Sequence, residues 1–260
     1  MDFGSLSGQE DQMVTLTDEQ IRSFREEGYL RLDPFISPEE LEPLRERIDA
    51  MVTGRMALPP QAFQTLDPKV YRTPNGRPVP EGIQGPAKYD AAFEEIASHP
   101  ALIAVMRQLI GEDAERFTDQ VIVKNPEAGV TTFFHQDGFY WRKSGQRTIN
   151  CWIALDDADA DNGALRFMPR SQTGGLIEHE AYFDDPTIHS GVTGEAFRRL
   201  RIPLDQVDFS RDRVAPVKTG GCVMFGKLCW HRSDPNRSGR QRRAYAIAYH
   251  GTNPALDEKD

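Results

Sequence analysis

Apolar residues in the first part of the chain recur at helical spacing. The best-defined set is Leu41, Leu44, Ile48 and Met51. These positions form one apolar face, which is typical of a helix that covers a sheet. Ser37, with Glu40 three residues later, forms a capping box that begins this helix. Similar signals predict a helix over 17–28, begun by Thr17, and two more over Ala91–Ser98 and Ala101–Ile110.

The hydrophobic pattern changes after residue 112. Short apolar or alternating runs, separated by turn residues, are typical of strands. These runs are Tyr29–Leu32 near the N-terminus and then Phe117–Lys124, Thr131–His135, Thr148–Leu155, Ala164–Met168, Arg213–Val217, Cys222–Phe225 and Arg243–Tyr249. Helices followed by many short strands predict an α+β fold with a sandwich or barrel core.

Two long segments show no clear periodicity. Residues 53–90 are rich in Pro and Gly, and residues 176–210 are mostly polar. A loop of this length in a compact domain is either functional or disordered. We expect these segments to act as lid loops over a site, with a simple surface excursion as the alternative.

No domain linker interrupts the chain, so we expect one domain after a short tail. The tail, residues 1–15, is expected to be disordered. The domain is expected to span 16–260, with a helical part over 16–112 and a strand-rich core over 113–252.

The composition is that of an acidic globular protein. The 260 residues carry a net charge of −9, and the sequence pI is near 5.2. Nucleic acids and anionic membrane surfaces need a basic face, so neither is expected as a partner. No apolar run approaches the ~20 residues that span a bilayer, and the polar N-terminus is unlike a signal peptide. We therefore expect a cytoplasmic protein.

The three cysteines are Cys151, Cys222 and Cys229. They form no CxxC pair and their number is odd, which favours buried structural thiols in a reduced protein. A thiol nucleophile or a zinc knuckle is the alternative.

The candidate chemistry lies around the stretch Thr131–Trp141. It contains His135 and Asp137, two residues apart and flanked by aromatic residues. Side chains at i and i+2 of a strand share one side, so we expect this imidazole and carboxylate to face one space. His231 is the third candidate, because the apolar run Cys222–Phe225 precedes it and a barrel would return it to the first strand. This triad is typical of non-haem Fe(II), although a zinc hydrolase also uses three protein ligands.

The last predicted strand favours the iron reading. Arg242 shares one strand face with Ala244, Ala246 and Ala248, which leaves room for a ligand beside the guanidinium. Arginine binds a carboxylate through two parallel hydrogen bonds. A metal with open positions and a carboxylate anchor suit a 2-oxo diacid. A solvated basic loop is the alternative.

Four motifs occur together along the chain. They are His135-Gln136-Asp137, Trp152–Asp157, Asn162–Leu165 followed by Met168-Pro169, and His231 followed by Arg242. Together they resemble the phytanoyl-CoA dioxygenase family of Fe(II)/2-oxoglutarate oxygenases, from about Leu16 to His250. The resemblance implies a double-stranded β-helix (a cupin-like jelly roll) with N-terminal covering helices.

The resemblance also implies roles for individual residues. His135, Asp137 and His231 would hold Fe(II), and Arg242 would bind the C5 carboxylate of 2-oxoglutarate. Further matches to cosubstrate positions are Lys124, Trp152, Thr132 and Ser233. Core packing is the alternative for Trp152, and turn chemistry is the alternative for Ser233. Related halogenases lack the carboxylate ligand, so the presence of Asp137 argues against halogenation.

The implied activity is a dioxygenase reaction that uses O₂ and 2-oxoglutarate as cosubstrates. It would hydroxylate an unactivated C–H bond of a small molecule and release succinate. Desaturation, epimerisation or cyclisation with the same cofactors stays open, as does a jelly-roll metal-binding protein without oxygenase activity. The expected substrate contacts are Phe139, Tyr140, Trp141, Tyr71 and Arg72. The sequence indicates neither the substrate nor the oligomeric state.

Overall fold

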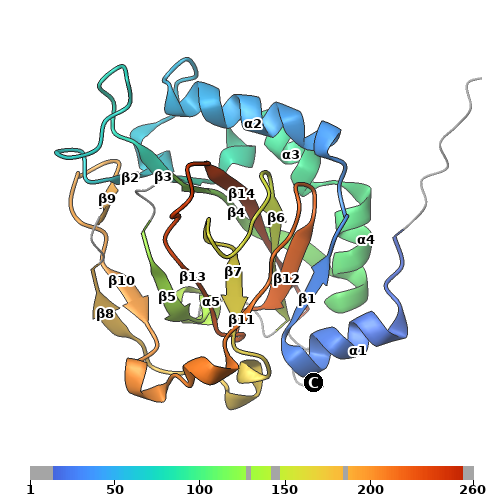
Figure 1. The fold of residues 1–260 in the computed structure, drawn as a ribbon. Coiled ribbons are helices and arrows are strands. Elements are labelled where there is room, and N and C mark those ends of the chain that lie inside the picture. The colour runs from blue at the N-terminus through green and yellow to red at the C-terminus, as the bar shows by residue number, and fades with distance from the viewer. Residues whose placement is uncertain (1–13, 127–129, 142–146, 184–186, 254–260) are drawn as a thin grey trace, which may run out of the picture.

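The computed structural model describes residues 14–126, 130–141, 147–183 and 187–253 (Figure 1). Its α-helices are α1 (Asp18–Glu27), α2 (Pro38–Val52), α3 (Ala91–Ala97), α4 (Pro100–Leu109) and α5 (Asp137–Tyr140). Short 3₁₀ turns are η1 (Pro60–Ala62), η2 (Pro86–Lys88), η3 (Ser171–Gly174), η4 (Leu204–Gln206) and η5 (Phe209–Arg211).

The strands are numbered in the order in which they occur along the chain. They are β1 (Tyr29–Leu32), β2 (Phe63–Leu66), β3 (Pro80–Gln84), β4 (Ala114–Lys124), β5 (Thr132–His135), β6 (Thr148–Ala154), β7 (Leu165–Phe167), β8 (Glu180–Tyr182), β9 (Ile188–Ser190), β10 (Arg199–Arg201), β11 (Arg213–Val214), β12 (Cys222–Gly226), β13 (His231–Ser233) and β14 (Arg242–Gly251).

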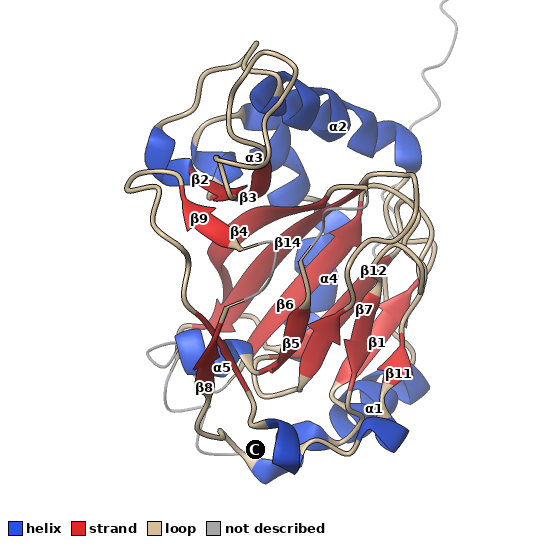
Figure 2. Cartoon of the chain, turned by 60° about the vertical axis from the view of Figure 1, so that its left-hand side comes forward, coloured by secondary structure: helices blue, strands red, loops and turns tan. Residues whose placement is uncertain are grey.

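The strands form two antiparallel sheets with the small one in front of the large one (Figure 2). The large sheet has the order β1-β12-β6-β14-β4-β3-β2-β9, and the small one β11-β7-β13-β5. A separate pair, β10-β8, completes the strands. The chain alternates between the sheets, since β4, β6, β12 and β14 lie in the large one and β5, β7 and β13 in the small one. The protein is thus a mixed structure of helices and antiparallel sheets.

Successive residues of the central strands enter two different cores, as the pleat requires. On β14, Tyr245 and Ile247 belong to a core shared with α2, α3 and α4, whereas Ala244 and Ala246 belong to a core between the sheets. The helices therefore pack on one face of the large sheet. The opposite face is left to line the space between the sheets.

The helix boundaries follow the capping signals of the sequence. The side chains of Thr17 and Ser37 accept hydrogen bonds from the backbone N–H of Gln20 and Glu40, which completes a capping box at α1 and at α2. Gly28 ends α1 with a left-handed backbone, φ 86°. These predictions are confirmed.

The two segments without periodicity are not simple loops. Residues 53–90 contain β2 and β3, and Gly82 of β3 pairs with Ile122 of β4, so this segment extends the large sheet. Pro80 and Gly82 are residue types depleted in strands, which hid β3 from the sequence pattern. Residues 176–210 likewise contain β8, β9 and β10.

Other expectations concern the termini and the cysteines. Residues 1–13 of the expected tail, 1–15, lie outside the described residues. Val14 is described, and its carbonyl accepts a hydrogen bond from Gln108 Nε2 at 2.9 Å. All three cysteines are buried and free, as expected. In the described part of the chain, no helix has the length and apolar character needed to cross a membrane.

Candidate metal and cosubstrate site

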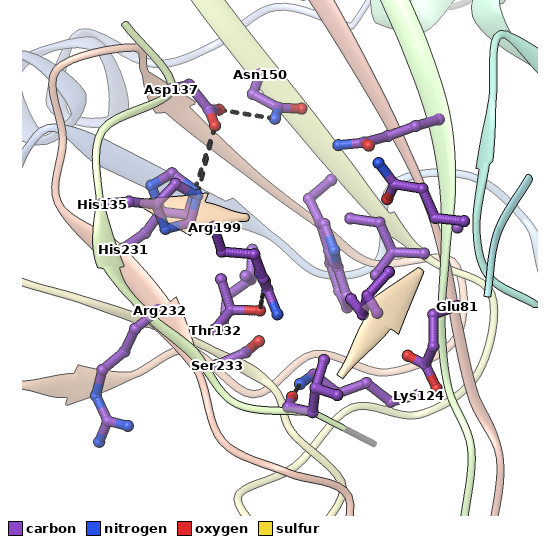
Figure 3. Close-up of a pocket in the computed structure, with 18 of the residues that line it drawn as sticks. Glu81, Lys124, Thr132, His135, Asp137, Asn150, Arg199, His231, Arg232 and Ser233 are labelled. Carbon is purple, nitrogen blue, oxygen red and sulfur yellow. Dashed lines mark hydrogen bonds and ion pairs between the residues drawn. The ribbon is translucent and has the colours of Figure 1, made fainter. Parts of the chain in front are cut away.

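Three potential metal ligands meet between the sheets (Figure 3). His135 ends β5 and His231 begins β13, and the two residues are direct partners across the small sheet. Their Nε2 atoms lie 3.7 and 3.6 Å from Oδ1 of Asp137. Ligand atoms bound at about 2.1 Å to one ion lie roughly 3 to 3.6 Å from each other. The spacing of the three side chains is therefore close to that of a metal site.

The local structure differs from the one assumed in the sequence argument. Asp137 does not continue the strand of His135 but begins the helical turn α5, where the N–H of Gly138 donates to the carbonyl of Lys227 at 2.8 Å. His231 begins a strand instead of standing in a turn after one. The side chains of His135 and Asp137 still face one space. The α5 turn, and not the alternation of side chains along a strand, directs Asp137 there.

Backbone carbonyls fix the protonation of both imidazoles. Nδ1 of His135 lies 2.9 Å from the carbonyl of Phe133, and Nδ1 of His231 lies 3.0 Å from that of Cys229. A carbonyl only accepts, so each Nδ1 carries the proton and each Nε2 keeps its lone pair. Burial lowers the pKa of His135 to about 3 and that of His231 to about 4. Both rings are therefore neutral at pH 7, which is the form that binds metals.

Asp137 is oriented by a residue that the sequence analysis did not select. Asn150 on β6 donates from Nδ2 to Oδ2 of Asp137 at 3.0 Å, and burial raises the pKa of the carboxyl group. Oδ1 is then left to face the histidines. Asn150 is an amide between Ile149 and Cys151 in β6, and this was a usable sequence signal for a functional position.

Arg242 supplies buried, unpaired hydrogen-bond donors. Its side chain is 1% exposed, and its Nε and Nη1 have no hydrogen-bond partner among the described residues. The guanidinium lies 5.2 Å from the ring centroid of Trp152. Burial lowers its pKa to about 10, so it stays charged at pH 7. A buried cation with unpaired donors is the arrangement that an anionic ligand completes.

The other expected cosubstrate contacts gather around Arg242. Lys124 is its direct partner on β4, and its Nζ donates to the carbonyl of Val130 at 2.5 Å. Lys124, Trp152, Thr132 and Ser233 all line the same cavity of about 150 Å³, together with Arg242 and the three potential metal ligands. The structure therefore brings together every residue expected to bind metal or cosubstrate.

The expected substrate contacts are only partly brought to the site. A second cavity of about 250 Å³ adjoins His135 and Asp137 and is lined by Tyr140 and Trp141. Phe139 lies on another side of the α5 turn and stacks on His179, with the ring centroids 4.3 Å apart. Of the described residues, neither Phe139, Tyr71 nor Arg72 lines either cavity.

The positions of Tyr71 and Arg72 have a local cause. Tyr71 packs on the small cluster of Leu66, Val130 and Ile188, and Arg72 donates to the carbonyl of Gly76 at 3.0 Å. Both follow β2, whose pairing with β3 directs this part of the chain. Both residues therefore lie outside the lining of the two cavities, and their role as substrate contacts stays a prediction.

The charged residues of the site that the sequence did not indicate include two from distant segments. Glu81 of β3 and Arg199 of β10 line the first cavity, and Arg199 lines the second as well. Arg199 donates to the carbonyl of Thr131 at 3.0 Å and to Oγ1 of Thr132 at 2.5 Å. Both lie in the segments without periodicity, where the sequence gives no face or direction.

The chain is similar to a described family and to individual known proteins. The family model described as Phytanoyl-CoA dioxygenase (PhyH) matches residues 24–244. Phytanoyl-CoA dioxygenase domain-containing protein 1 of Danio rerio is 25% identical over 274 residues, which cover 90% of each chain. Methylphosphonate hydroxylase of Gimesia maris is 25% identical over 253 residues, 95% of this chain and 84% of that one.

A solved structure has a similar fold. EvdO2 from Micromonospora carbonacea var. aurantiaca, crystallised in complex with 2-oxoglutarate, superposes with a TM-score of 0.68 and 23% identity. The match covers 92% of this chain and 93% of that one.

Proposed function

Because the chain belongs to the phytanoyl-CoA dioxygenase family, we propose that it is a non-haem Fe(II)/2-oxoglutarate-dependent dioxygenase that hydroxylates a small molecule. One observation carries this proposal. A donor set of two histidines and one carboxylate shares a cavity with a buried guanidinium that has unpaired donors. The donor set alone would also suit zinc, but the guanidinium adds an anchor for the far carboxylate of a diacid.

The proposal extends to the fold. The alternation of consecutive strands between the two sheets supports a double-stranded β-helix, the cupin-like jelly roll, as the core. In this reading α1 to α4 are its covering helices, and 16–260 is a single domain. Segments 53–90 and 176–210 form part of the wall around the reacting centre.

In the proposed site, His135, Asp137 and His231 hold the iron, while Arg242 and Lys124 bind the far carboxylate of 2-oxoglutarate. Trp152 supports the guanidinium of Arg242. Fe(II), 2-oxoglutarate and O₂ together supply an oxidant that hydroxylates an unactivated C–H bond while 2-oxoglutarate is converted to succinate and CO₂. The protein's contribution is to orient both substrates and to exclude water.

Thr132 and Ser233 have supporting places in this site. Thr132 is held by Arg199, and Ser233 is 5% exposed in the same cavity. Their hydroxyl groups are the proposed neutral hydrogen-bonding groups beside the cosubstrate.

The substrate in this proposal is a small molecule that enters through the second cavity. Tyr140 and Trp141 provide its aromatic wall, and Gln64, Gln84 and Gln120 provide amide groups. Hydroxylation is the simplest outcome, and desaturation, epimerisation or cyclisation would use the same cofactors.

The activity is tested on protein purified without oxygen. Fe(II) and 2-oxoglutarate are added, and succinate formation and O₂ uptake are measured with a panel of small metabolites. We expect 2-oxoglutarate turnover that the substrate stimulates. His135→Ala and Asp137→Ala should each reduce it at least about a hundredfold, because two remaining ligands hold the metal poorly.

Gln108→Ala is a suitable control, since Gln108 binds the backbone near residue 14, outside the residues that line the two cavities. An absence of turnover together with tightly bound zinc would contradict the proposal. The protein would then be a metal-binding jelly roll without oxygenase activity.

A further inference from the structure

Glu81 is a buried acid beside the cations of the first cavity. It is 5% exposed, and its Oε1 accepts a hydrogen bond from Asn125 Nδ2 at 2.9 Å. Figure 3 shows Glu81 and Lys124 together at the end of the cavity away from His135 and His231. Glu81 is not part of the group of possible metal ligands formed by His135, Asp137 and His231, so the proposed chemistry leaves it without a role.

The groups that face Glu81 are mainly cations. The positive charges of Lys124 on β4, Arg242 on β14 and Arg199 on β10 each lower the pKa of Glu81. The neighbouring strand β2 contributes only uncharged residues, and beyond it His189 of β9 lies 4.0 Å from Asp67. Glu81 is therefore the acid placed to balance these cations before any ligand is bound.

Arg242 has a second acidic neighbour, but that acid is already engaged. The charge of Asp156 raises the pKa of Arg242, yet its carboxylate accepts three hydrogen bonds from Arg243, from the backbone N–H, Nε and Nη2, each at 2.8 Å. Arg242 keeps two unpaired donors all the same. A ligand carboxylate that pairs with Arg242 would thus bring a second negative charge close to Glu81.

Two carboxylates in one buried space do not both stay ionised without cost. Building on the function proposed above, we propose that Glu81 is the internal counter-ion of the cosubstrate pocket and takes up a proton from solvent when the far carboxylate of a 2-oxo diacid binds. Binding of the cosubstrate is then linked to pH through a residue that touches neither iron nor substrate. Glu81 therefore affects cosubstrate binding through its charge, and it takes no part in the reaction itself.

The direction of the linkage follows from the state of the free protein. Burial raises the pKa of Glu81 to about 7, and the hydrogen bond from Asn125 and the cations lower it only in part. A bound carboxylate raises the pKa further. Below pH 7 Glu81 is protonated in both states, so affinity is independent of pH. Above pH 7 the free protein must take up a proton on binding, so affinity falls as the pH rises.

Glu81→Gln tests this linkage. Glutamine keeps the acceptor for Asn125 but is neutral at every pH, like protonated glutamic acid. Binding of 2-oxoglutarate to the Fe(II) protein is measured by anaerobic calorimetry in two buffers of different ionisation enthalpy. For wild type at pH 8 we expect uptake of close to one proton, and a Kd that rises about fivefold from pH 7 to pH 8.

The variant should take up no proton and should show no such rise. At pH 8 it should bind 2-oxoglutarate about tenfold more tightly than wild type. Glu94→Gln is the matched control, because Glu94 lies on α3, pairs with Arg116 and has a lowered pKa. It should behave like wild type.

A second arm needs no variant. Pyruvate has the 2-oxo acid group but lacks the far carboxylate, so its binding to wild type should take up no proton. Equal proton uptake with pyruvate would place the titrating group elsewhere and overturn the proposal. So would a Glu81→Gln variant with unchanged proton uptake, or one that binds 2-oxoglutarate more weakly at every pH. If wild type binds no 2-oxoglutarate, the proposed function itself fails, and this inference fails with it.

Discussion

At the scale of single residues, the site depends on groups that are buried without a partner. On β14, Ala244 and Ala246 lie in the core between the sheets, and Arg242 is the buried charged residue of this strand that lines the cavity. Hydrogen bonds to charged groups contribute about 1.5–3 kcal/mol when both partners are present. A ligand that accepts hydrogen bonds from the unpaired donors of Arg242 therefore gains binding free energy.

Arg242→Ala should raise the KM for 2-oxoglutarate about 10- to 150-fold, because the loss of a charged hydrogen-bonding partner costs about 1.5–3 kcal/mol. The kcat at saturating cosubstrate should change far less. Initial-rate measurements of succinate formation over a range of 2-oxoglutarate concentrations check this.

Arg243→Ala is the control, since Arg243 lies on the opposite face of the strand and binds Asp156 and Asp49. That variant should lose stability but keep its KM. Equal changes of KM in the two variants would refute the assigned role of Arg242.

The sequence pattern predicted side-chain positions best on long regular strands. Strand parity placed Arg242 on one face with small residues, the family resemblance selected Lys124, and the structure pairs these two residues across β14 and β4. Parity gave no help with Glu81 or Arg199. Their positions depend on pairing between distant segments, which no local pattern records.

At the scale of elements, a single turn holds Lys124 in place. Gly163 has φ 86°, and a Cβ added there would lie 2.6 Å from both the carbonyl oxygen of Asp234 and Cδ of Lys124. The turn between β6 and β7 is itself fixed by Asn162, which donates to the carbonyl of Asp157 at 2.7 Å. The Asn162-Gly163 motif seen in the sequence thus shapes a turn that leaves room for the side chain of Lys124.

Gly163→Ala should therefore affect stability and the cosubstrate together. The left-handed backbone alone costs a non-glycine residue roughly 1–2 kcal/mol, and the contact with Lys124 adds to it. We expect a lower melting temperature and a higher KM for 2-oxoglutarate.

Thermal unfolding and succinate kinetics measure the two effects. Gly174→Ala is the control, because an added Cβ there meets nothing within 4 Å. A Gly163→Ala variant that melts and turns over like wild type would show that the turn tolerates a side chain.

Short elements were the ones that sequence patterns missed. The turn α5 has four residues and β13 has three, so neither shows a period that distinguishes helix from strand. These two elements carry Asp137 and His231. The sequence therefore selected three side chains that the structure brings together, but it assigned the local structure of Asp137 and His231 incorrectly.

At the scale of the whole molecule, the large sheet separates stability from chemistry. One face packs against α2, α3 and α4, and the other face lines the proposed site. A defect in the helical layer should therefore change the free energy of unfolding without changing the site.

Leu44→Ala tests this separation. Leu44 on α2 is 1% exposed, and truncation of a buried leucine costs about 2–5 kcal/mol. The melting temperature should fall by several degrees, whereas the KM for 2-oxoglutarate at a temperature below unfolding should stay within about twofold of wild type.

Leu204→Ala, at a residue that is 41% exposed, should leave both quantities almost unchanged. A large change of KM in Leu44→Ala would show that the helical layer and the site are coupled.

The place of β14 in the large sheet also bears on how the protein is made. This strand lies between β6 and β4, so the middle of the sheet is filled by residues 242–251 after both neighbours have been translated. His231 and Arg242 follow His135 by 96 and 107 residues along the chain. A growing chain thus carries His135 and Asp137 before the third proposed ligand and the proposed carboxylate anchor have been translated. The proposed site can therefore be complete only after residue 242 has been translated.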